Sequence, residues 1–289
     1  MYNDSEEKIG LALRDVRNQV VIASKTMIRA AKGAADHIAN SLRLLQTGYV
    51  DILQFHNVSK VEDLENILAP GGAMEAFEEA RDKGQVKVIG FSSHNHEVAR
   101  QAIATGRFAT VQFPFNFLEN DSYEKVFLPA KERGMGLIAM KPLGGGLLDN
   151  AGVCFRFLQQ YPDLMPIPGI QAKEEIDEIS ALYRERAPLN DDDQKIIAGL
   201  RAELGDRFCH RCGYCMPCEQ GIQIPLVMLF KSQLKRFPPE TVRNHSGSAV
   251  QKVEDCIECG QCEERCPYDL PISEMLHENL ERFHEVFGK

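Results

Sequence analysis

The sequence predicts an α/β fold of repeating βα units, followed by a small, mostly helical, cysteine-rich domain. Short β-branched segments alternate with helical patterns through the long N-terminal region, and the strand starts lie roughly 25–35 residues apart, the length of one βα unit. Eight of the nine cysteines follow residue 205, so the composition changes there. We therefore predict two domains, residues 1–204 and residues 205–289.

Six strands are expected, and nearly all of their residues are apolar. They are predicted at residues 20–25, 49–56, 86–92, 109–113, 136–141 and 164–169. Helical patterns lie between and after them, at residues 34–46, 73–84, 96–106, 123–134, 149–160 and 173–186. Such strands are typical of a parallel sheet that is covered on both faces. No G-x-G-x-x-G sequence follows a strand, which favours a barrel of βα units over a doubly wound dinucleotide fold.

Polar residues recur where the expected strands end. Lys25, His56, Ser92 and Lys141 end the first, second, third and fifth strands, and Gln112 lies late in the fourth. Any one of them alone would more often simply cap its strand. Five in series predict a site at the carboxyl ends of the strands, where βα barrels carry their active sites.

The composition is that of an ordinary globular chain. Hydrophobic residues make up 44% and charged residues 26% of the 289 residues, and the formal net charge is −9. An acidic chain is a poor match for nucleic acid or for an anionic membrane surface. No apolar run reaches the roughly 18–20 residues of a transmembrane helix, and the first residues do not resemble a signal peptide. Nine cysteines without a secretory signal predict a reducing cytoplasm, in which clustered thiols bind metal.

The cysteines of the second domain form an internal repeat. They are Cys209, Cys212, Cys215 and Cys218 in the first copy and Cys256, Cys259, Cys262 and Cys266 in the second. The second copy, followed by Pro267, has the C-x2-C-x2-C-x3-C-P spacing of bacterial ferredoxins. The first copy departs from this spacing in two ways. Only two residues separate Cys215 from Cys218, and Pro217 comes before Cys218 instead of after it. Helical spacing at residues 225–237 and 273–287 makes the rest of this domain mostly helical.

In two-cluster ferredoxins the fourth cysteine of each copy usually ligates the other cluster. This rule predicts one [4Fe–4S] cluster on Cys209, Cys212, Cys215 and Cys266, and a second on Cys256, Cys259, Cys262 and Cys218. The altered first copy leaves open which cluster Cys218 ligates. Zinc is the alternative metal, although zinc ribbons usually divide their C-x-x-C pairs between two knuckles. Cys154 lies on an apolar helix and is expected to be a buried structural thiol.

Several motifs carry a resemblance to a known family. In order along the first 200 or so residues, they are "YNDSEEKIGLAL", "VVIASK", "SLRLLQTGYVDILQFH", "VKVIGFSSHN", "MKPLGGG" and "PIPG". In motif, order and spacing the chain is similar to the aldo/keto reductases. With its C-terminal cysteines it resembles the subgroup that carries a fused ferredoxin-like 4Fe-4S domain. The resemblance implies a (β/α)8 barrel of the TIM-barrel type that uses NADPH or NADH to reduce aldehydes and ketones, or to oxidise alcohols.

The resemblance also implies roles for individual residues. Tyr2 would be the general acid that protonates the carbonyl oxygen, Lys25 would lower the pKa of Tyr2, and His56 would orient the carbonyl. The nicotinamide would meet Ser92, Ser93 and Gln112, the pyrophosphate would meet Lys141, Pro142 and Leu143, and the adenosine end would meet Gly169 and Lys173. Lys173 would favour a 2′-phosphate, and a solvated lysine at a helix start is an equally good interpretation.

The family pattern includes a segment that has no counterpart here. In the family two strands precede the tyrosine motif, and the second carries an Asp that pairs with the lysine. The chain starts one residue before Tyr2, so the resemblance implies a barrel that lacks its first two strands and this Asp. A start codon called too late, a truncated gene or a fragment would each explain the difference.

The sequence therefore predicts an NAD(P)H-dependent oxidoreductase that acts on a small carbonyl compound or alcohol and carries two [4Fe–4S] clusters. Hydride transfer moves two electrons at once, whereas each cluster accepts one, and no flavin motif is visible. The clusters would exchange electrons with a redox protein partner, work through a flavin, or be structural. A second hypothesis is an electron carrier whose inactive barrel remnant is a docking surface. A third is a truncated chain without function.

Overall fold

The computed structural model describes residues 4–204, 207, 209, 213–266 and 268–288, and the chain divides into two compact units. The first, here called the sheet unit, comprises residues 1–142 and 154–188. The second, here called the cysteine unit, comprises residues 143–153 and 189–289. The domain boundary after residue 204 stays a prediction.

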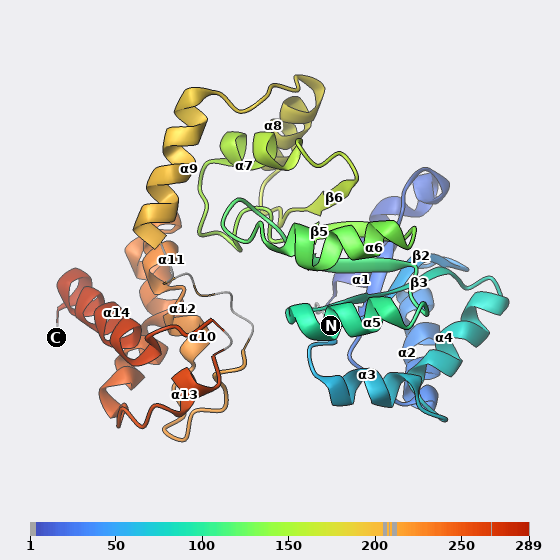
Figure 1. The fold of residues 1–289 in the computed structure, drawn as a ribbon, viewed down its shortest axis with the longest axis horizontal. Coiled ribbons are helices and arrows are strands. Elements are labelled where there is room, and N and C mark those ends of the chain that lie inside the picture. Colours follow the sequence, from blue (N-terminus) through green and yellow to red (C-terminus); the bar gives the residue numbers. More distant parts are fainter. Residues whose placement is uncertain (1–3, 205–206, 208, 210–212, 267, 289) are drawn as a thin grey trace. The chain divides into compact units, whose positions relative to one another are not determined.

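The sheet unit contains a six-stranded parallel sheet (Figure 1). Its strands are β1 (Ala23–Thr26), β2 (Val50–Phe55), β3 (Val86–Ser92), β4 (Thr110–Pro114), β5 (Gly136–Met140) and β6 (Leu164–Ile167). Each strand pairs with the next one along the chain, in the order β1-β2-β3-β4-β5-β6. Sequential parallel pairing is the pattern of a barrel built from βα units. The prediction of six parallel strands is confirmed.

Helices connect the strands in the sheet unit. They are α1 (Ser5–Leu13), α2 (Ala31–Leu44), α3 (Val61–Leu68), α4 (Ala73–Asp82), α5 (His96–Ala104), α6 (Leu128–Glu132), α7 (Ala151–Leu158) and α8 (Lys173–Arg184). The division between the two units passes through α7. A 3-10 helix (Arg14–Gln19) follows α1, and a π-helical turn (Tyr123–Phe127) precedes α6. Helix α4 packs against β3 and α6 packs against β5 (Figure 1).

Strand β2 shows which side of the sheet carries the helices. The ring of Phe55 stacks on Phe77 of α4, with 3.9 Å between the ring centroids, and both side chains are fully buried. Because neighbouring residues of a strand point to opposite faces, Gln54 lies on the other face. Lys25 of β1 is in register with Gln54 and shares that face. The aromatic core thus orients β2 so that polar side chains occupy the face away from α4.

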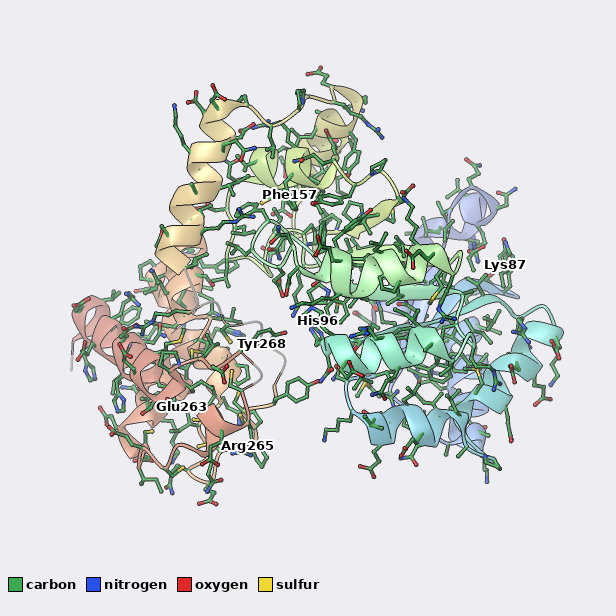
Figure 2. The ribbon with its side chains drawn as sticks, in the orientation of Figure 1. Lys87, His96, Phe157, Glu263, Arg265 and Tyr268 are labelled. Carbon is green, nitrogen blue, oxygen red and sulfur yellow. The ribbon has the colours of Figure 1, made fainter. Side chains whose placement is uncertain are left out.

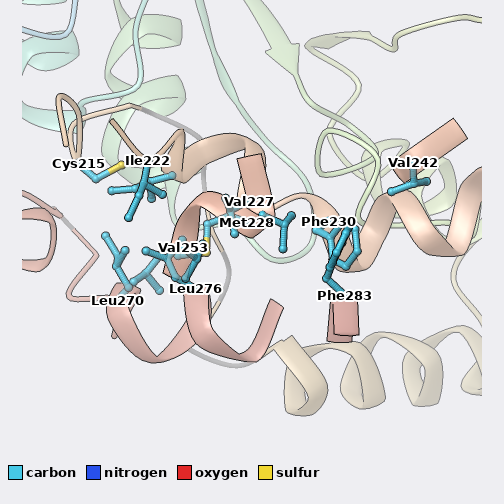
Figure 3. Close-up of a cluster of buried hydrophobic side chains, with 13 residues drawn as sticks. Cys215, Ile222, Val227, Met228, Phe230, Val242, Val253, Leu270, Leu276 and Phe283 are labelled. Atoms are coloured by element: carbon cyan, nitrogen blue, oxygen red, sulfur yellow. The ribbon is translucent and has the colours of Figure 1, made fainter. Parts of the chain in front are cut away.

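The cysteine unit is helical around a core of its own. Its helices are α9 (Asp191–Leu204), α10 (Ile224–Val227), α11 (Phe230–Arg236), α12 (Pro239–Gln251), α13 (Gln261–Glu264) and α14 (Ile272–Phe287), with a 3-10 helix at Lys252–Asp255. Buried apolar side chains from α10, α11, α12 and α14 form one cluster, in which the rings of Phe230 and Phe283 lie 5.9 Å apart (Figure 3). The single helical pattern at residues 225–237 corresponds to two helices, α10 and α11.

Among the residues that the structure describes, no helix has both the length and the apolar character needed to cross a bilayer.

Candidate functional site

The sheet collects five of the predicted site residues along its strands. His56 directly follows β2, Ser92 ends β3, and Lys141 directly follows β5. Lys25 is the third residue of β1, which continues to Thr26, and Gln112 is the middle residue of β4. Parallel pairing therefore places these residues toward the carboxyl ends of neighbouring strands, where the sequence predicts a site. Tyr2 lies outside the described residues.

The imidazole of His56 is held by Ser92. The Ser92 hydroxyl lies 3.2 Å from Nδ1 of His56 and accepts a hydrogen bond of 2.9 Å from the backbone N–H of Asn57. Ser92 is 1% exposed, and a buried hydroxyl needs an acceptor for its own hydrogen. Nδ1 of His56 is the acceptor that the contacts provide. The hydroxyl therefore donates to Nδ1, and the neutral imidazole carries its hydrogen on Nε2.

The surroundings of His56 keep it neutral. Burial, the charge of Lys25 and the charge of Arg29, in that order, lower the pKa of His56 to about 4. Arg29 also donates a 2.7 Å hydrogen bond to the His56 carbonyl oxygen and pairs with Asp63 at 3.3 Å. Burial also lowers the pKa of Lys25. Two cations beside a half-buried histidine disfavour a third positive charge, so His56 is a hydrogen-bond donor without charge at neutral pH.

Ser93 and Gln112 lie next to this pair on β3 and β4. The backbone N–H of Ser93 donates to the carbonyl of Gln112 at 3.1 Å, and the Ser93 hydroxyl donates to the carbonyl of Asn95 at 3.2 Å. The Gln112 amide donates to the sulfur of Met140 at 3.4 Å. Both side chains are buried, at 0% and 4% exposure. The sheet thus brings Ser92, Ser93 and Gln112 into adjacent positions.

Lys141 begins the glycine-rich turn that follows β5. Its backbone has a φ of +57°, and its Nζ lies 3.4 Å from Nδ1 of His94. The side-chain amide of Asn116 donates to the Lys141 carbonyl at 3.1 Å, and this hydrogen bond stabilises the left-handed backbone conformation of Lys141. Pro142 ends the first segment of the sheet unit, and Leu143 belongs to the cysteine unit, where its carbonyl accepts from the N–H of Gly146 at 2.8 Å.

The two residues predicted for the adenosine end lie near the start of α8. Lys173 is the first residue of α8, its side chain is 79% exposed, and it pairs with Asp177 one turn later. This is the geometry of a solvated lysine at a helix start, one of the two interpretations that the sequence allows. Gly169 precedes the helix, and a Cβ added there would meet no atom within 4 Å. The nucleotide role of both residues stays a prediction.

Gln54 is a candidate that sequence reasoning missed. It is 0% exposed, and neither its amide nitrogen nor its amide oxygen has a hydrogen-bond partner among the described residues. Gln54 shares its sheet face with Lys25 and stands two residues before His56. A polar residue at this spacing in "ILQFH" is the signal that could have indicated it. A cavity of about 320 Å³ also lies beside Lys25, between β1 and α1.

The cysteine unit contains two cavities lined by thiols. The first, here called the Cys256 cavity, is lined by Cys218, Cys256, Cys259 and Cys262. The second, here called the Cys209 cavity, is lined by Cys209, Cys215 and Cys266. Cys212 lies outside the described residues. Each cavity thus combines thiols of one copy of the repeat with the fourth thiol of the other copy, as the ferredoxin rule predicts.

Hydrogen bonds hold the two cysteine segments together. Arg265 donates to the carbonyl of Pro217 at 3.1 Å, and Gln261 donates to Glu219 at 3.1 Å. Arg265 and Glu263 are labelled in the cysteine unit in Figure 2. Glu263 accepts from the backbone N–H of Ser273 at 2.8 Å, which ties the second segment to α14. These contacts place Cys218 beside the second copy of the repeat.

The donors around the Cys256 cavity have the chemistry of iron–sulfur ligands, although among the described residues no three metal-binding side chains are gathered closely enough to hold a metal ion. Burial, with a smaller effect of Glu263, raises the pKa of the Cys262 thiol, so iron binding has to displace a proton there. Ile222, Ile224 and Leu276 supply apolar lining. Thiolate ligands inside an apolar shell are the usual environment of such clusters. Cys154, by contrast, is 1% exposed in α7.

Two protein families match the sequence. The aldo/keto reductase family matches residues 1–153, and a 4Fe-4S dicluster domain matches residues 208–271. The second match favours iron–sulfur clusters over zinc. Among curated proteins, the chain is 30% identical over 159 residues to the aldo-keto reductase YhdN of Bacillus subtilis, covering 51% of this chain and 46% of that protein. It is 33% identical over 118 residues to the uncharacterized oxidoreductase YrpG of the same organism, covering 39% and 34%.

Solved structures share the fold. The holo form of aldo-keto reductase AKR11C1 from Bacillus halodurans aligns with a TM-score of 0.56 and 20% identity, over 68% of this chain and 76% of that one. An aldo-keto reductase from Klebsiella pneumoniae in complex with NADPH aligns with a TM-score of 0.57 and 21% identity, over 69% and 75%. The chain spans about half the length of the curated relatives it matches, or less.

The fold prediction and the family resemblance are both confirmed by these matches. The family match covers more than half of the chain, and the sheet order agrees with it. The chain belongs to the aldo/keto reductase family and carries a 4Fe-4S dicluster domain.

Proposed function

We propose that the protein is an NAD(P)H-dependent oxidoreductase that interconverts carbonyl compounds and alcohols. The observation that carries this proposal is the state of His56, whose pKa is lowered to about 4 and whose Nδ1 faces the hydroxyl of Ser92. The remaining hydrogen on Nε2 can then donate to the oxygen of a substrate carbonyl. Membership of the aldo/keto reductase family supports the same reaction class.

Reduction of a carbonyl requires a hydride on carbon and a proton on oxygen. Bound NADPH or NADH supplies the hydride. The His56 imidazole orients and polarises the carbonyl. Tyr2, assigned by the family resemblance, gives its phenolic proton to the oxygen. The ammonium group of Lys25 stabilises the phenolate that remains, and burial of Lys25 strengthens this attraction.

The proposed nucleotide contacts follow the sheet. Ser92, Ser93 and Gln112 would hold the nicotinamide carboxamide, and because Ser92 donates to His56, its hydroxyl can only accept from the carboxamide nitrogen. Lys141, Pro142 and Leu143 would meet the pyrophosphate, and Gly169 and Lys173 the adenosine end. The NADPH in the Klebsiella pneumoniae relative supports the phosphorylated nucleotide.

The cysteine unit is proposed to hold two [4Fe–4S] clusters. Cys218, Cys256, Cys259 and Cys262 would ligate one cluster in the Cys256 cavity. Cys209, Cys212, Cys215 and Cys266 would ligate the other in the Cys209 cavity, with Cys212 assigned by spacing alone. When bound, the clusters supply one-electron chemistry, which suits exchange with a redox protein partner. A reducing cytoplasmic location is part of the proposal, because eight thiols have to stay available for iron.

The test combines anaerobic purification with two measurements on the full chain. NADPH and NADH binding is followed by quenching of nicotinamide fluorescence, and turnover is measured with simple aldehydes. We expect His56→Asn to bind the nucleotide like the wild type but to lose roughly 100-fold or more in kcat/KM. The control is His245→Asn, since His245 is an exposed residue of α12.

Each outcome separates the proposed function from its alternative. Absence of nucleotide binding would overturn the reductase assignment. Cluster bleaching by a low-potential donor, reversed by an oxidant and accompanied by no carbonyl turnover, would indicate an electron carrier instead.

A further inference from the structure

The two cysteine-lined cavities have a common wall. Of the described residues that line the Cys256 cavity and the Cys209 cavity, Ile224 is the one that lines both. Ile222 lines only the Cys256 cavity, and Ile272 lines only the Cys209 cavity. Ile224 therefore borders both sets of thiols.

Local structure holds Ile224 firmly in this position. It is the first residue of α10, and its N–H donates to the carbonyl of Ile222 at 3.0 Å. Its carbonyl accepts from the N–H of Met228 at 3.0 Å, and Pro225 follows it in the first turn. The residue is 1% exposed and belongs to the hydrophobic core of the cysteine unit. Its backbone groups are satisfied and its side chain is packed, so it has little freedom to move.

We propose that Ile224 is an apolar barrier shared by both cluster sites, so that one side chain sets the reduction potentials of both clusters. This inference rests on the proposed assignment of two [4Fe–4S] clusters. Reduction adds one electron, and therefore one negative charge, to a cluster. Water stabilises added charge and an apolar wall does not, so solvent exposure and the surrounding shell set the potential. Ile224 excludes water from both sites at once, whereas Ile222 and Ile272 each protect one.

The experiment is a redox titration of the full, anaerobically purified chain. Dithionite is the titrant, and the reduced clusters are followed by electron paramagnetic resonance. The wild type is expected to show two midpoint potentials. Ile224→Ala is expected to shift both to more positive values, because the space left behind admits water to both cavities. Ile222→Ala and Ile272→Ala are matched controls that remove the same atoms, and each is expected to shift only one midpoint, a different one in each variant.

The controls make the result decisive. A shift of a single midpoint in Ile224→Ala, or of neither, overturns the shared barrier. So does a shift of both midpoints in Ile222→Ala or Ile272→Ala. If Ile224→Ala does not assemble clusters, Ile224→Val repeats the test with a smaller change of volume, and both midpoints are again expected to move together. A single reducible centre in the wild type overturns the two-cluster assignment itself, so that failure is recognised before any variant is compared.

Discussion

The two units position their reactive groups in different ways. In the cysteine unit, each cavity takes most of its thiols from one short segment, in which two or three residues separate neighbouring cysteines. In the sheet unit, Lys25, His56 and Ser92 come from β1, the end of β2 and β3, and parallel pairing brings them together. One site is built mainly by local spacing and the other by long-range pairing. A substitution in one unit should therefore leave the chemistry of the other intact.

Burial acts on both units, with opposite effects on the pKa values. It lowers the pKa of Lys25 in the sheet unit and raises the pKa of Cys262 in the cysteine unit. The cause is the same, because a low-dielectric environment disfavours the charged form of each group, the ammonium in one case and the thiolate in the other. In the proposed function, the partly buried Lys25 would be a stronger electrostatic partner for a phenolate, and the partly buried Cys262 would lose its proton when a metal binds.

The largest expected effect tests whether the thiols of the Cys256 cavity together ligate one cluster. Cys259→Ala should remove the cluster of the Cys256 cavity and halve the iron and sulfide content. Cys259 is exposed, so the substitution removes a ligand with little loss of packing. Iron and acid-labile sulfide analysis is the measurement. Cys154→Ala is the control and should keep the full iron content. Equal iron in both variants would contradict the ligand assignment.

The next effect tests the electrostatics of the sheet unit. Lys25→Met keeps a long side chain but removes the charge beside His56, and it should lower kcat/KM for aldehyde reduction by roughly 100-fold or more. Lys32→Met, on the exposed surface of α2, is the matched control. Iron content should be unchanged in both variants. Normal turnover by Lys25→Met would show that the reaction does not depend on this cation.

A smaller effect tests the contact between Ser92 and His56. Ser92→Ala removes the donor to Nδ1, so the imidazole should populate both neutral tautomers, and kcat/KM should fall by about 10-fold, the effect of one hydrogen bond. Nitrogen-15 NMR of the histidine ring reports the tautomer directly. Ser59→Ala removes a nearby buried hydroxyl that donates to the side-chain oxygen of Asn57 at 2.8 Å, and it should leave the His56 signal unchanged. An unchanged tautomer in Ser92→Ala would refute the proposed role.

The smallest effect is on the pH dependence of stability. His56 has a pKa of about 4 in the folded chain and about 6.5 when unfolded, so the unfolded state binds more protons between these values. The free energy of unfolding of the sheet unit should therefore fall as the pH is lowered from about 6.5 to about 4, and the fall should be small because His56 is only half-buried and solvent screens its charge. The measurement is urea denaturation at several pH values. The free energy of unfolding of His56→Gln should change less steeply with pH than that of the wild type. An identical pH dependence in both proteins would mean that His56 has the same pKa in the folded and unfolded chain, which would contradict the lowered pKa.

The sequence by itself predicts the repetitive features of this protein. The six strands follow from apolar segments at regular spacing, and the two thiol-bearing segments follow from C-x-x-C repeats. Both patterns depend on residues that are close in sequence. Position at the ends of predicted strands makes Lys25, His56 and Ser92 candidates, and the family motifs assign their roles. They carry no information about which tautomer His56 adopts or why it stays neutral.

Tertiary structure decides the features that depend on which side chains pack together. The sequence leaves the position of Cys218 open, and the contacts of Arg265 and Gln261 place it at the Cys256 cavity. Gln54 is buried because Phe55 packs on α4 and turns its neighbour to the opposite face. Ile224 lines two cavities whose thiols come from segments that are far apart in the chain. Burial, pKa values and the residues that line a cavity all depend on which side chains are close in space. Segments that are distant in sequence become close only when the chain folds.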